Sequence, residues 1–283
     1  MAFKRTKTDD IKEIIKELAK KQTTKCTKCN SLLKKSKNEN VLGICSWKGC
    51  KKIHYQWSNT IFEKTKLSKT RCLKILEMWV YGTPIKYLCA FFRTSRQTIC
   101  KLLKKMAKII EPKYNAECEM IGGADIIVEV DESKFGKRKY NRGHRVEGIW
   151  IFGMVERTER KKIRLIAVDD RTAETLNSKL AKYINPESII YSDSWKGYKD
   201  IIKNFAGHFQ VNHSQNYVDP INGAHTNTIE GNWNGIKMNI PYRSRTKERI
   251  QLYLIRFMLQ RNEGNNLLAA LLKYLFYYFL SLF

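Results

Sequence analysis

The sequence predicts an α/β domain over residues 124–262, preceded by two smaller modules. Three observations predict this arrangement. From residue 124 onward, short apolar runs of strand length alternate with amphipathic segments of helix length. Residues 23–62 carry pairs of cysteines among short β-like pieces, and residues 63–115 show apolar positions at helical spacing. Because 43% of the residues are hydrophobic, the chain can form buried cores, and global disorder is excluded.

The net charge is strongly positive and unevenly distributed. The chain has 53 Lys and Arg against 27 Asp and Glu, a formal charge of +26. Residues 1–110 hold 27 basic and 7 acidic side chains, so +20 of this charge lies there. Such an excess favours an anionic partner, nucleic acid before a membrane surface. The alternative is an ordinary solvated surface in a lysine-biased proteome, but the segregation favours a DNA-binding front attached to a more neutral body.

Residues 1–22 predict a basic N-terminal helix. An amphipathic segment runs from Asp9 to Lys20, and its apolar face consists of Ile11, Ile14, Ile15 and Leu18. The first 21 residues are charged throughout and lack the apolar run of a secretion signal. The eight cysteines are therefore expected to be reduced thiols or metal ligands rather than disulfides.

Residues 23–62 predict a zinc ribbon. Cys26 and Cys29 are separated by two residues, and after fifteen more residues Cys45 and Cys50 form a wider pair with four residues between them. Two such pairs on adjacent turns can place four thiolates around a structural Zn²⁺, which a module this small needs in order to fold. His54 is an alternative fourth ligand. The competing interpretation is four unconnected reduced cysteines.

Residues 63–115 predict a helix-turn-helix that binds DNA. Apolar residues at helical spacing run from Leu67 to Tyr81, and Gly82-Thr83-Pro84 interrupts the helix. Two further helical runs, over 85–92 and 99–110, flank a short polar turn. The side chains suited to phosphates and base edges in a major groove are Arg96, Gln97, Lys101, Lys104 and Lys105. A plain helical hairpin is the alternative.

Residues 124–262 show a regular succession of strands and helices. Three strands come first, a helix with Thr172 as its N-cap follows, and strands and helices then alternate. The order β-β-β-α-β-α-β-α is that of the ribonuclease-H-like fold. The expected elements are strands at 124–131, 148–156 and 162–168, a helix at 172–184, a strand at 188–193, a helix at 195–205, a strand at 208–213 and a helix from Thr226.

Three acidic residues mark the ends of these elements. Asp131 and Asp193 each end a strand, and Glu230 lies on the last helix. Neighbouring strand ends would bring them together, and three carboxylates at one place repel one another unless divalent cations lie between them. Two Mg²⁺ or Mn²⁺ ions suit such oxygen ligands and support in-line displacement at a phosphodiester. The alternative is that these are surface acids that cap strands.

The last helix carries a basic residue on the acidic face. Lys237 lies seven residues after Glu230, nearly two helical turns, so both fall on one face. Asn227, three residues before Glu230, shares that face. We expect Lys237 to hold a DNA phosphate beside the metal ions. Trp233 is expected to pack against the sheet, with stacking on a base as the alternative.

Residues 263–283 predict an apolar C-terminal helix. Leu267 to Phe283 is nearly all apolar and is broken by Lys273. Seventeen residues lie at the lower limit for a membrane span, and the lysine falls near the middle. The pattern therefore favours a buried or oligomer-forming helix over a membrane tail, and no membrane partner is expected.

Four motifs are similar to those of a known family: residues 130–139, 148–153, 191–195 and 225–233. They resemble the Merlin-type DDE transposases, eukaryotic relatives of a bacterial insertion-sequence family with an ISXO2-like transposase domain. The resemblance runs from about residue 24 to 262 and includes the zinc ribbon and helix-turn-helix. The wide second cysteine pair and the apolar C-terminus depart from the family's pattern.

The resemblance implies that Asp131, Asp193 and Glu230 are the catalytic acids, with 36 residues between the second and the third. Some relatives use asparagine as the third member, which makes Asn227 the alternative. A carboxylate binds Mg²⁺ better than an amide does, which favours Glu230.

The sequence therefore predicts a cut-and-paste DNA transposase. It would bind double-stranded terminal inverted repeats through residues 1–115, cleave at the element ends and join the 3′-hydroxyls to target DNA. A basic loop after the first acidic strand would contact DNA through Lys137, Arg138 and Lys139. Because two element ends must be held together, we expect a homodimer or larger assembly. Its expected location is the nucleus in a eukaryote, and otherwise the cytoplasm or nucleoid.

Two other functions are compatible with the same residues. A domesticated DNA-binding protein would keep the fold without transposing, although the three intact acids argue against it. A structure-specific nuclease of the same fold is the other, and the separate zinc and helix-turn-helix modules, suited to sequence recognition, make it less favoured.

Overall fold

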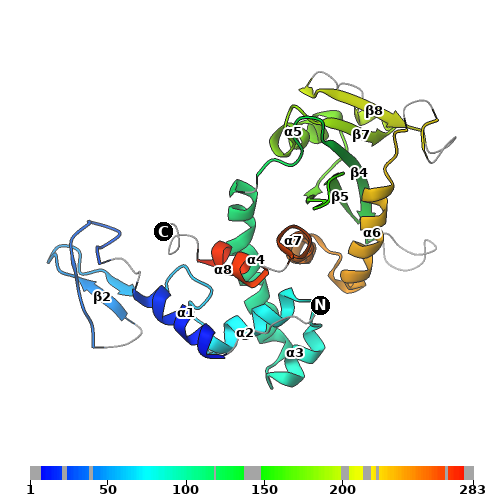
Figure 1. Ribbon diagram of the computed structural model, residues 1–283. Coiled ribbons are helices and arrows are strands. Elements are labelled where there is room, and N and C mark those ends of the chain that lie inside the picture. Colours follow the sequence, from blue (N-terminus) through cyan, green and yellow to red (C-terminus); the bar gives the residue numbers. More distant parts are fainter. Residues whose placement is uncertain are drawn as a thin grey trace. The chain divides into compact units, whose positions relative to one another are not determined.

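The chain divides into two units. In the computed structural model, the described residues are 8–20, 24–37, 41–117, 119–136, 148–198, 204–212, 218–220, 223–264 and 267–276. The N-terminal unit consists of residues 1–114 together with 265–283, and the sheet unit consists of residues 115–264. Figure 1 labels the elements of both units.

The N-terminal unit is built mainly from helices. They are α1 (Thr8–Lys20), α2 (Lys69–Val80), α3 (Ile85–Phe91), α4 (Arg96–Glu117) and α8 (Leu267–Leu275). Local signals set their ends: Ser68 caps α2 by accepting the amide N–H of Arg71, and Ser95 accepts the amide of Thr98 at the start of α4. Gly82 follows α2 with a φ of 101°, a conformation that favours glycine.

The apolar C-terminal segment forms part of this unit. Helix α8 packs on α2. Beyond it the Phe276 ring lies 5.5 Å from that of Phe62, and the Tyr274 ring lies 5.1 Å from that of Tyr114. The described part of the segment, residues 267–276, therefore packs among helices through Leu267, Leu271 and Phe276, as its composition predicts. Within the described ranges, no helix combines the length and apolarity that crossing a membrane requires.

A small antiparallel sheet precedes α2 in the chain. Its strands are β1 (Leu33–Lys34), β2 (Val41–Cys45) and β3 (Ile53–Tyr55), in the order β1-β2-β3. The sheet is too short to enclose an apolar core, and Leu32, Ile44 and Ile53 are exposed. Something other than apolar burial must therefore stabilise it.

The sheet unit contains a mixed five-stranded sheet. Its strands lie in the order β6-β5-β4-β7-β8, in which β4 pairs antiparallel with β5 and β5 with β6, whereas β7 runs parallel to both β4 and β8. The unit is thus of the mixed α/β class, as the sequence predicts. The strand bounds are β4 Ile127–Phe135, β5 Ile149–Glu156, β6 Ile163–Val168, β7 Ile189–Asp193 and β8 Gly207–Val211.

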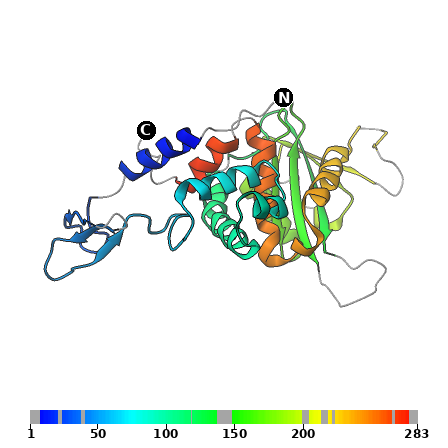
Figure 2. The same ribbon diagram turned by 90° about the horizontal axis from the view of Figure 1, so that it is seen from below.

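Helices cover both faces of this sheet (Figure 1 and Figure 2). Side chains alternate along β4, so Val128 and Val130 pack with Leu176 and Leu180 of helix α5 on one face. Residues Glu129, Asp131 and Phe135 face the other side, toward α6. The covering elements are α5 (Ala173–Tyr183), α6 (Asn227–Asn239) and α7 (Lys247–Glu263), with the short 3₁₀ turns η1 (Lys196–Tyr198) and η3 (Tyr242–Ser244).

The succession of elements follows the predicted one, with three differences. Helix α7 follows α6, although no helix was predicted over its residues. Strand β4 does not end at Asp131 but continues to Phe135, because Glu132 to Phe135 pair with β5. Where a helix was predicted over 195–205, the described residues contain only η1, and residues 199–203 lie outside them. Thr172 caps α5 as predicted, since its side chain accepts the amide of Thr175.

Candidate functional site

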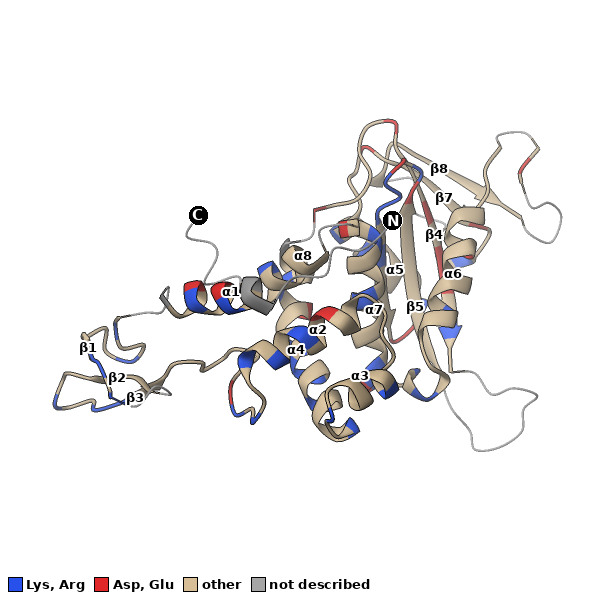
Figure 3. Cartoon of the chain, turned by 60° about the horizontal axis from the view of Figure 1, so that its bottom comes forward, with Lys and Arg blue, Asp and Glu red and all other residues tan. Residues whose placement is uncertain are grey.

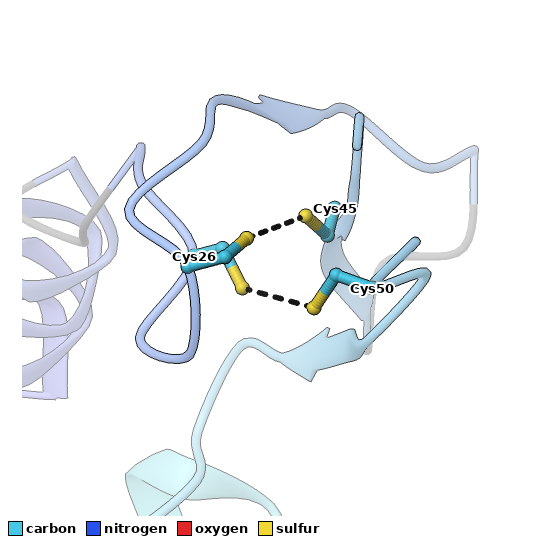
Figure 4. Close-up of side chains that lie close together, drawn as sticks. Cys26, Cys45 and Cys50 are labelled. Carbon is cyan, nitrogen blue, oxygen red and sulfur yellow. Dashed lines mark hydrogen bonds between the residues drawn. The ribbon is translucent and has the colours of Figure 1, made fainter. Parts of the chain in front are cut away.

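Four cysteine side chains beside the small sheet lie close together, and Figure 4 labels three of them. The sulfur atoms of Cys26, Cys29, Cys45 and Cys50 all lie within 4.8 Å of one another. Cys26 lies 3.8 Å from Cys50, and Cys29 lies 3.3 Å from Cys45. Four thiols at this spacing can hold a metal ion such as Zn²⁺, for which thiolates are preferred ligands. The cluster is the feature that can stabilise a sheet without an apolar core.

The wide second pair is accommodated by a turn. The amides of Cys50 and Lys51 both donate to the carbonyl of Trp47, which folds the intervening residues back so that Cys50 faces Cys45. His54 does not replace Cys50 in the cluster. Its Nε2 lies 3.3 Å from the sulfur of Cys26, close enough for a hydrogen bond to a metal-binding thiolate.

The thiols of this cluster differ in acidity. Backbone and side-chain hydrogen bonds from Ser31 lower the pKa of Cys29 to about 6. Burial raises the pKa of Cys45 to about 12. A bound divalent cation would favour the thiolate form at all four positions, because metal ligation requires deprotonated sulfur.

Lys and Arg residues, blue in Figure 3, occur along α4 and in the small sheet. Arg96, Gln97, Lys101 and Lys104 of α4 are exposed. Lys105 is only partly exposed, and its Nζ donates to the carbonyl oxygen of Glu63 over 2.6 Å. The predicted DNA contacts Lys137, Arg138 and Lys139 lie outside the described residues.

Asp131 and Asp193 lie on adjacent parallel strands. The register pairs Ile127 with Ile189, and the next two residues of β4 and β7 continue it. This pairing ends at Glu129 and Tyr191, two residues before Asp131 and Asp193. The negative charge of Asp193 raises the pKa of Asp131, so the two carboxylates lie near each other. The two acids therefore stand where β4 and β7 stop pairing.

Helix α6 lies along β4 and carries Glu230 to the same region. The indole N–H of Trp233 donates to Oδ2 of Asp131 over 2.7 Å. Glu230 lies one turn before Trp233 on the helix, so it faces the acids of the sheet. Its Oε1 accepts the hydroxyl of Thr226 over 2.9 Å. Near the end of the helix, Lys237 stands 5.8 Å from the centre of the Phe135 ring.

The N-terminus of α6 is capped by the sheet rather than by its own N-cap residue. Glu129 is fully buried, and its Oε2 accepts the amide N–H of Ile229 over 2.9 Å. Its Oε1 accepts Nε of Arg157 over 2.6 Å, and Nη2 of Arg157 donates to the carbonyl of His225 over 2.8 Å. A buried carboxylate with these partners anchors the first turn of α6, where the helix dipole also favours negative charge.

The three acids influence one another electrostatically. The pKa of Asp131 is raised to about 6, mainly by burial and to a smaller extent by the negative charges of Asp193 and Glu230, against the hydrogen bond from Trp233. The three carboxylates are not gathered as tightly as the thiols. Among the described residues, the cysteines are the one group of three or more potential ligands close enough to share an ion as they stand. Three carboxylates near one another repel unless a cation lies between them.

A glycine allows α6 to approach the sheet. Gly153 of β5 pairs with Asp131, and a Cβ atom at Gly153 would lie 2.6 Å from the ring of Trp233 and 2.9 Å from Ile229. Changing Gly153→Ala is therefore expected to push α6 off the strand and to lower the free energy of unfolding by about 1–3 kcal/mol. Chemical denaturation would measure this loss.

Gly231 offers the matched control for that substitution. It lies on α6 itself, and an added Cβ would meet nothing within 4 Å. The change Gly231→Ala should leave stability unchanged or raise it by up to about 1 kcal/mol, since alanine favours helix. Equal stability losses in the two variants would contradict the packing role of Gly153.

Glu132 is a buried carboxyl on the opposite face of β4. Its side chain is 2% exposed, accepts the hydroxyl of Tyr198 and lies 3.8 Å from a guanidinium nitrogen of Arg171. Burial raises the pKa of Glu132 from 4.5 to about 7, and the charges of Asp131 and Asp193 add to this. The folded state therefore binds the Glu132 proton more tightly than the unfolded state does.

This pKa predicts a pH-dependent stability. Because the folded-state pKa is the higher one, the free energy of unfolding should fall as pH rises from 4.5 to 7. Glu132→Gln cannot ionise and should lose less stability between pH 5 and pH 8 than the wild type, by at most about 3 kcal/mol. Denaturation of both proteins without Mg²⁺ would measure this, and equal pH dependence would rule it out. The contribution of the cysteine cluster cancels in the comparison.

Sequence reasoning did not assign roles to Glu129, Arg157 and Gly153. The alternation of β4 places Glu129 on the face of Asp131, which is a signal that the sequence contains. Arg157 and Gly153 could not be recognised in this way. The partners of Arg157 lie 28 and 68 residues away in the chain, and Gly153 meets side chains of α6. Trp233, expected to pack on the sheet, also donates a hydrogen bond to Asp131.

Comparison with known proteins identifies the family. The ISXO2-like transposase domain matches residues 121–262, half of the chain and most of the sheet unit. A Haemophilus influenzae protein described as an uncharacterized transposase-like protein is 28% identical over 94 residues, which cover 33% of this chain and 75% of the relative. The matched region contains the sheet, both strand-borne acids and α6. The chain therefore belongs to the family of ISXO2-like transposases.

Proposed function

We propose that this protein is a DNA transposase that cuts and joins DNA with Asp131, Asp193 and Glu230. The observation that carries the proposal is the convergence of three elements of the family domain. The pairing of β4 with β7 ends two residues before Asp131 and Asp193, and the hydrogen bond from Trp233 to Asp131 attaches α6, which carries Glu230, to the strand of the first acid; both observations support the proposal. An isolated surface acid would not need such an arrangement.

The fold is proposed to be ribonuclease-H-like. Three antiparallel strands, of which the first is central, are followed by two strands parallel to that first one. This order and these directions are those expected of the fold. In that architecture, acids at the ends of the central strands and on the last helix face one another.

The carboxylates fit a pair of divalent cations. Oxygen ligands suit Mg²⁺ or Mn²⁺, and two such ions would activate the attacking oxygen and stabilise the leaving one. Burial, and to a smaller extent the charges of Asp193 and Glu230, raise the pKa of Asp131, and a bound cation would favour its charged form. Asp131, Asp193 and Glu230 would hold the ions, and Lys237 would bind a phosphate of the DNA.

The reaction has two steps of the same kind. In cleavage, a water oxygen bonds to phosphorus and the O3′–P bond breaks, which leaves a 3′-hydroxyl on the element. In strand transfer, that hydroxyl oxygen attacks a phosphorus of the target, and the target's own 3′-oxygen leaves. The number of phosphodiester bonds is unchanged in the second step, so it needs no external energy source. The acids would orient the attacking oxygen and the scissile phosphate.

The N-terminal unit is proposed to recognise the element ends. Helices α3 and α4 flank a short turn, and the exposed residues Arg96, Gln97, Lys101 and Lys104 belong to α4. This pattern supports a helix-turn-helix whose second helix reads the major groove. The positive charge of residues 1–110 supports phosphate contacts, which the cysteine module would share. A homodimer or larger assembly would hold two ends together.

The test is cleavage of the DNA that flanks the gene. Inverted repeats on either side would be synthesised as duplexes and incubated with the full chain and Mg²⁺ or Mn²⁺. Metal-dependent cuts at the repeat ends, followed by joining to a plasmid, would support the proposal. Specific binding without cleavage would replace it with a domesticated DNA-binding protein. Cleavage of branched DNA regardless of sequence would replace it with a structure-specific nuclease.

A further inference from the structure

Four side chains on the face of β4 that carries Glu132 alternate between cations and aromatic rings, and the last of them adjoins Asp193. The cation–aromatic ladder consists of Lys134, Trp150, Arg171 and Trp195. The Arg171 guanidinium lies 3.9 Å from the ring centre of Trp150 and 4.3 Å from that of Trp195, so it is held between two indoles. Lys134 covers Trp150 at 5.2 Å. Lys134 of β4 and Trp150 of β5 are cross-strand neighbours, and Trp195 follows the end of β7.

Trp195 is held in place although it is exposed. Its side chain is 39% exposed, yet its backbone amide donates to Oδ1 of Asp193 over 3.0 Å. Its indole N–H donates to the carbonyl of Arg171 over 3.5 Å, and the ring packs against Gly197. Single exposed apolar residues are common, but they are rarely fixed by hydrogen bonds at two points. The ring is therefore a positioned surface beside a proposed catalytic acid.

The guanidinium of Arg171 is partly exposed and can bind an anion at the edge of the stacked rings. Within the described part of the chain, its ion-pair partner is the carboxylate of Glu132 at 3.8 Å, which is too long for a hydrogen bond. The two acids before it in the chain have other partners. Asp169 pairs with Lys247 over 2.6 Å, and Asp170 accepts the amide and hydroxyl of Thr172. The rings fix the plane of the guanidinium, and a fixed guanidinium edge suits a phosphate.

We propose that the ladder binds an unpaired nucleotide of the DNA strand beside the cleaved phosphate, with its base on Trp195 and its phosphate on Arg171. The inference rests on the proposed function, because the acids define where cleavage occurs. An indole face stacks on any base, but only where that base is unpaired, since a duplex exposes base edges rather than faces. The charged edge of Arg171 beside the ring supplies the contact that a nucleotide needs in addition to stacking.

The test measures single-strand binding by the full chain without Mg²⁺ or Mn²⁺, so that no cleavage takes place. The probe is an oligothymidylate of about 12 nucleotides with one central 2-aminopurine, whose emission is quenched when it stacks. Wild type should quench it. Trp195→Ala should bind the oligonucleotide about tenfold more weakly and leave its emission unquenched. Trp195→Phe should keep most of the affinity and most of the quenching. The affinity of Trp195→Ala for a duplex of the same length should stay within about twofold of the wild-type value, since duplex DNA offers no base face.

Two further variants make the result specific. Phe209 of β8 is also 39% exposed but has no cation stacked on it among the described residues, so Phe209→Ala is the matched control and should bind as wild type does. Arg171→Gln should reduce the salt dependence of single-strand binding by about one phosphate contact, a slope change of roughly 0.7. Thermal denaturation of each variant would verify folding.

The outcomes separate this inference from the proposed function. If Trp195→Ala binds and quenches the single strand as wild type does, or if Phe209→Ala loses as much, the ladder is not a nucleotide site. That result can accompany normal metal-dependent cleavage, in which case only the ladder is rejected. If the Trp195 effect is found but no DNA end is ever cleaved, nucleotide binding stands and the transposase reaction is rejected.

Discussion

Asp193→Asn is expected to reduce metal-dependent DNA cleavage by about a thousandfold or more, while the protein stays folded and bound to DNA. An amide is neutral and a weaker ligand for Mg²⁺ than a carboxylate, so the cation site would lose one of its anionic members. The substitution should not unfold the chain. The asparagine oxygen can still accept the amide of Trp195, and removing a negative charge relieves the repulsion on Asp131. Gel assays of end cleavage and thermal denaturation would measure both effects.

Asp169→Asn is the matched control for this variant. Asp169 is an exposed acid of the same unit that pairs with Lys247, and its loss should leave cleavage within about twofold of wild type, since exposed ion pairs contribute little. Glu230→Gln should lose DNA cleavage as Asp193→Asn does. Asn227→Ala should retain cleavage if Glu230 is the third acid. Cleavage by Asp193→Asn at the wild-type rate would refute the assignment.

Cys45→Ser is expected to remove the bound metal and unfold the small sheet, with loss of specific DNA binding. Zinc binding to such sites is coupled to folding and is typically worth about 10–16 kcal/mol, more than a sheet with exposed Leu32, Ile44 and Ile53 can replace. Elemental analysis of the purified wild type should find one zinc ion per cysteine cluster. Circular dichroism and binding to the element ends would report the consequences.

Cys89→Ser provides the control for the loss of a thiol. Cys89 lies on α3, is a free thiol and does not belong to the four-cysteine group. The variant should keep its zinc and its affinity for DNA. A Cys45→Ser protein that still contained stoichiometric zinc would show that the four thiols are not the ligand set.

The sequence allowed prediction of features that depend on local chemistry. The Thr172 cap, the β5–β6 hairpin and the start of α6 after Thr226 all follow from short-range patterns. The cysteine cluster could also be predicted, because two closely spaced pairs have few other uses. These signals are contained within a turn or a strand, so no knowledge of distant partners was needed.

Features that depend on distant contacts could not be predicted. The capping of α6 by Glu129 joins residues one hundred positions apart, and the hydrogen bond from Trp233 to Asp131 spans 102. The continuation of β4 past Asp131 depends on pairing with β5 rather than on the residues of β4 alone. Lys105 has the spacing of a DNA contact, but it donates to the carbonyl of Glu63. In each case a tertiary partner decides the role of the side chain.

The attachment of α6 to β4 has a consequence for how these enzymes can diverge. Two hydrogen bonds fix the position of Glu230 on α6: the amide of Ile229 donates to Glu129, and the indole of Trp233 donates to Asp131. The length of chain that precedes the helix does not fix it. Insertions or deletions between β8 and α6 would therefore leave the third acid where it is. We therefore expect the number of residues between Asp193 and Glu230 to vary among relatives, and the glycine on β5 and the indole on α6 to change together. Sequence spacing is thus a weaker guide to this site than the Gly153–Trp233 contact.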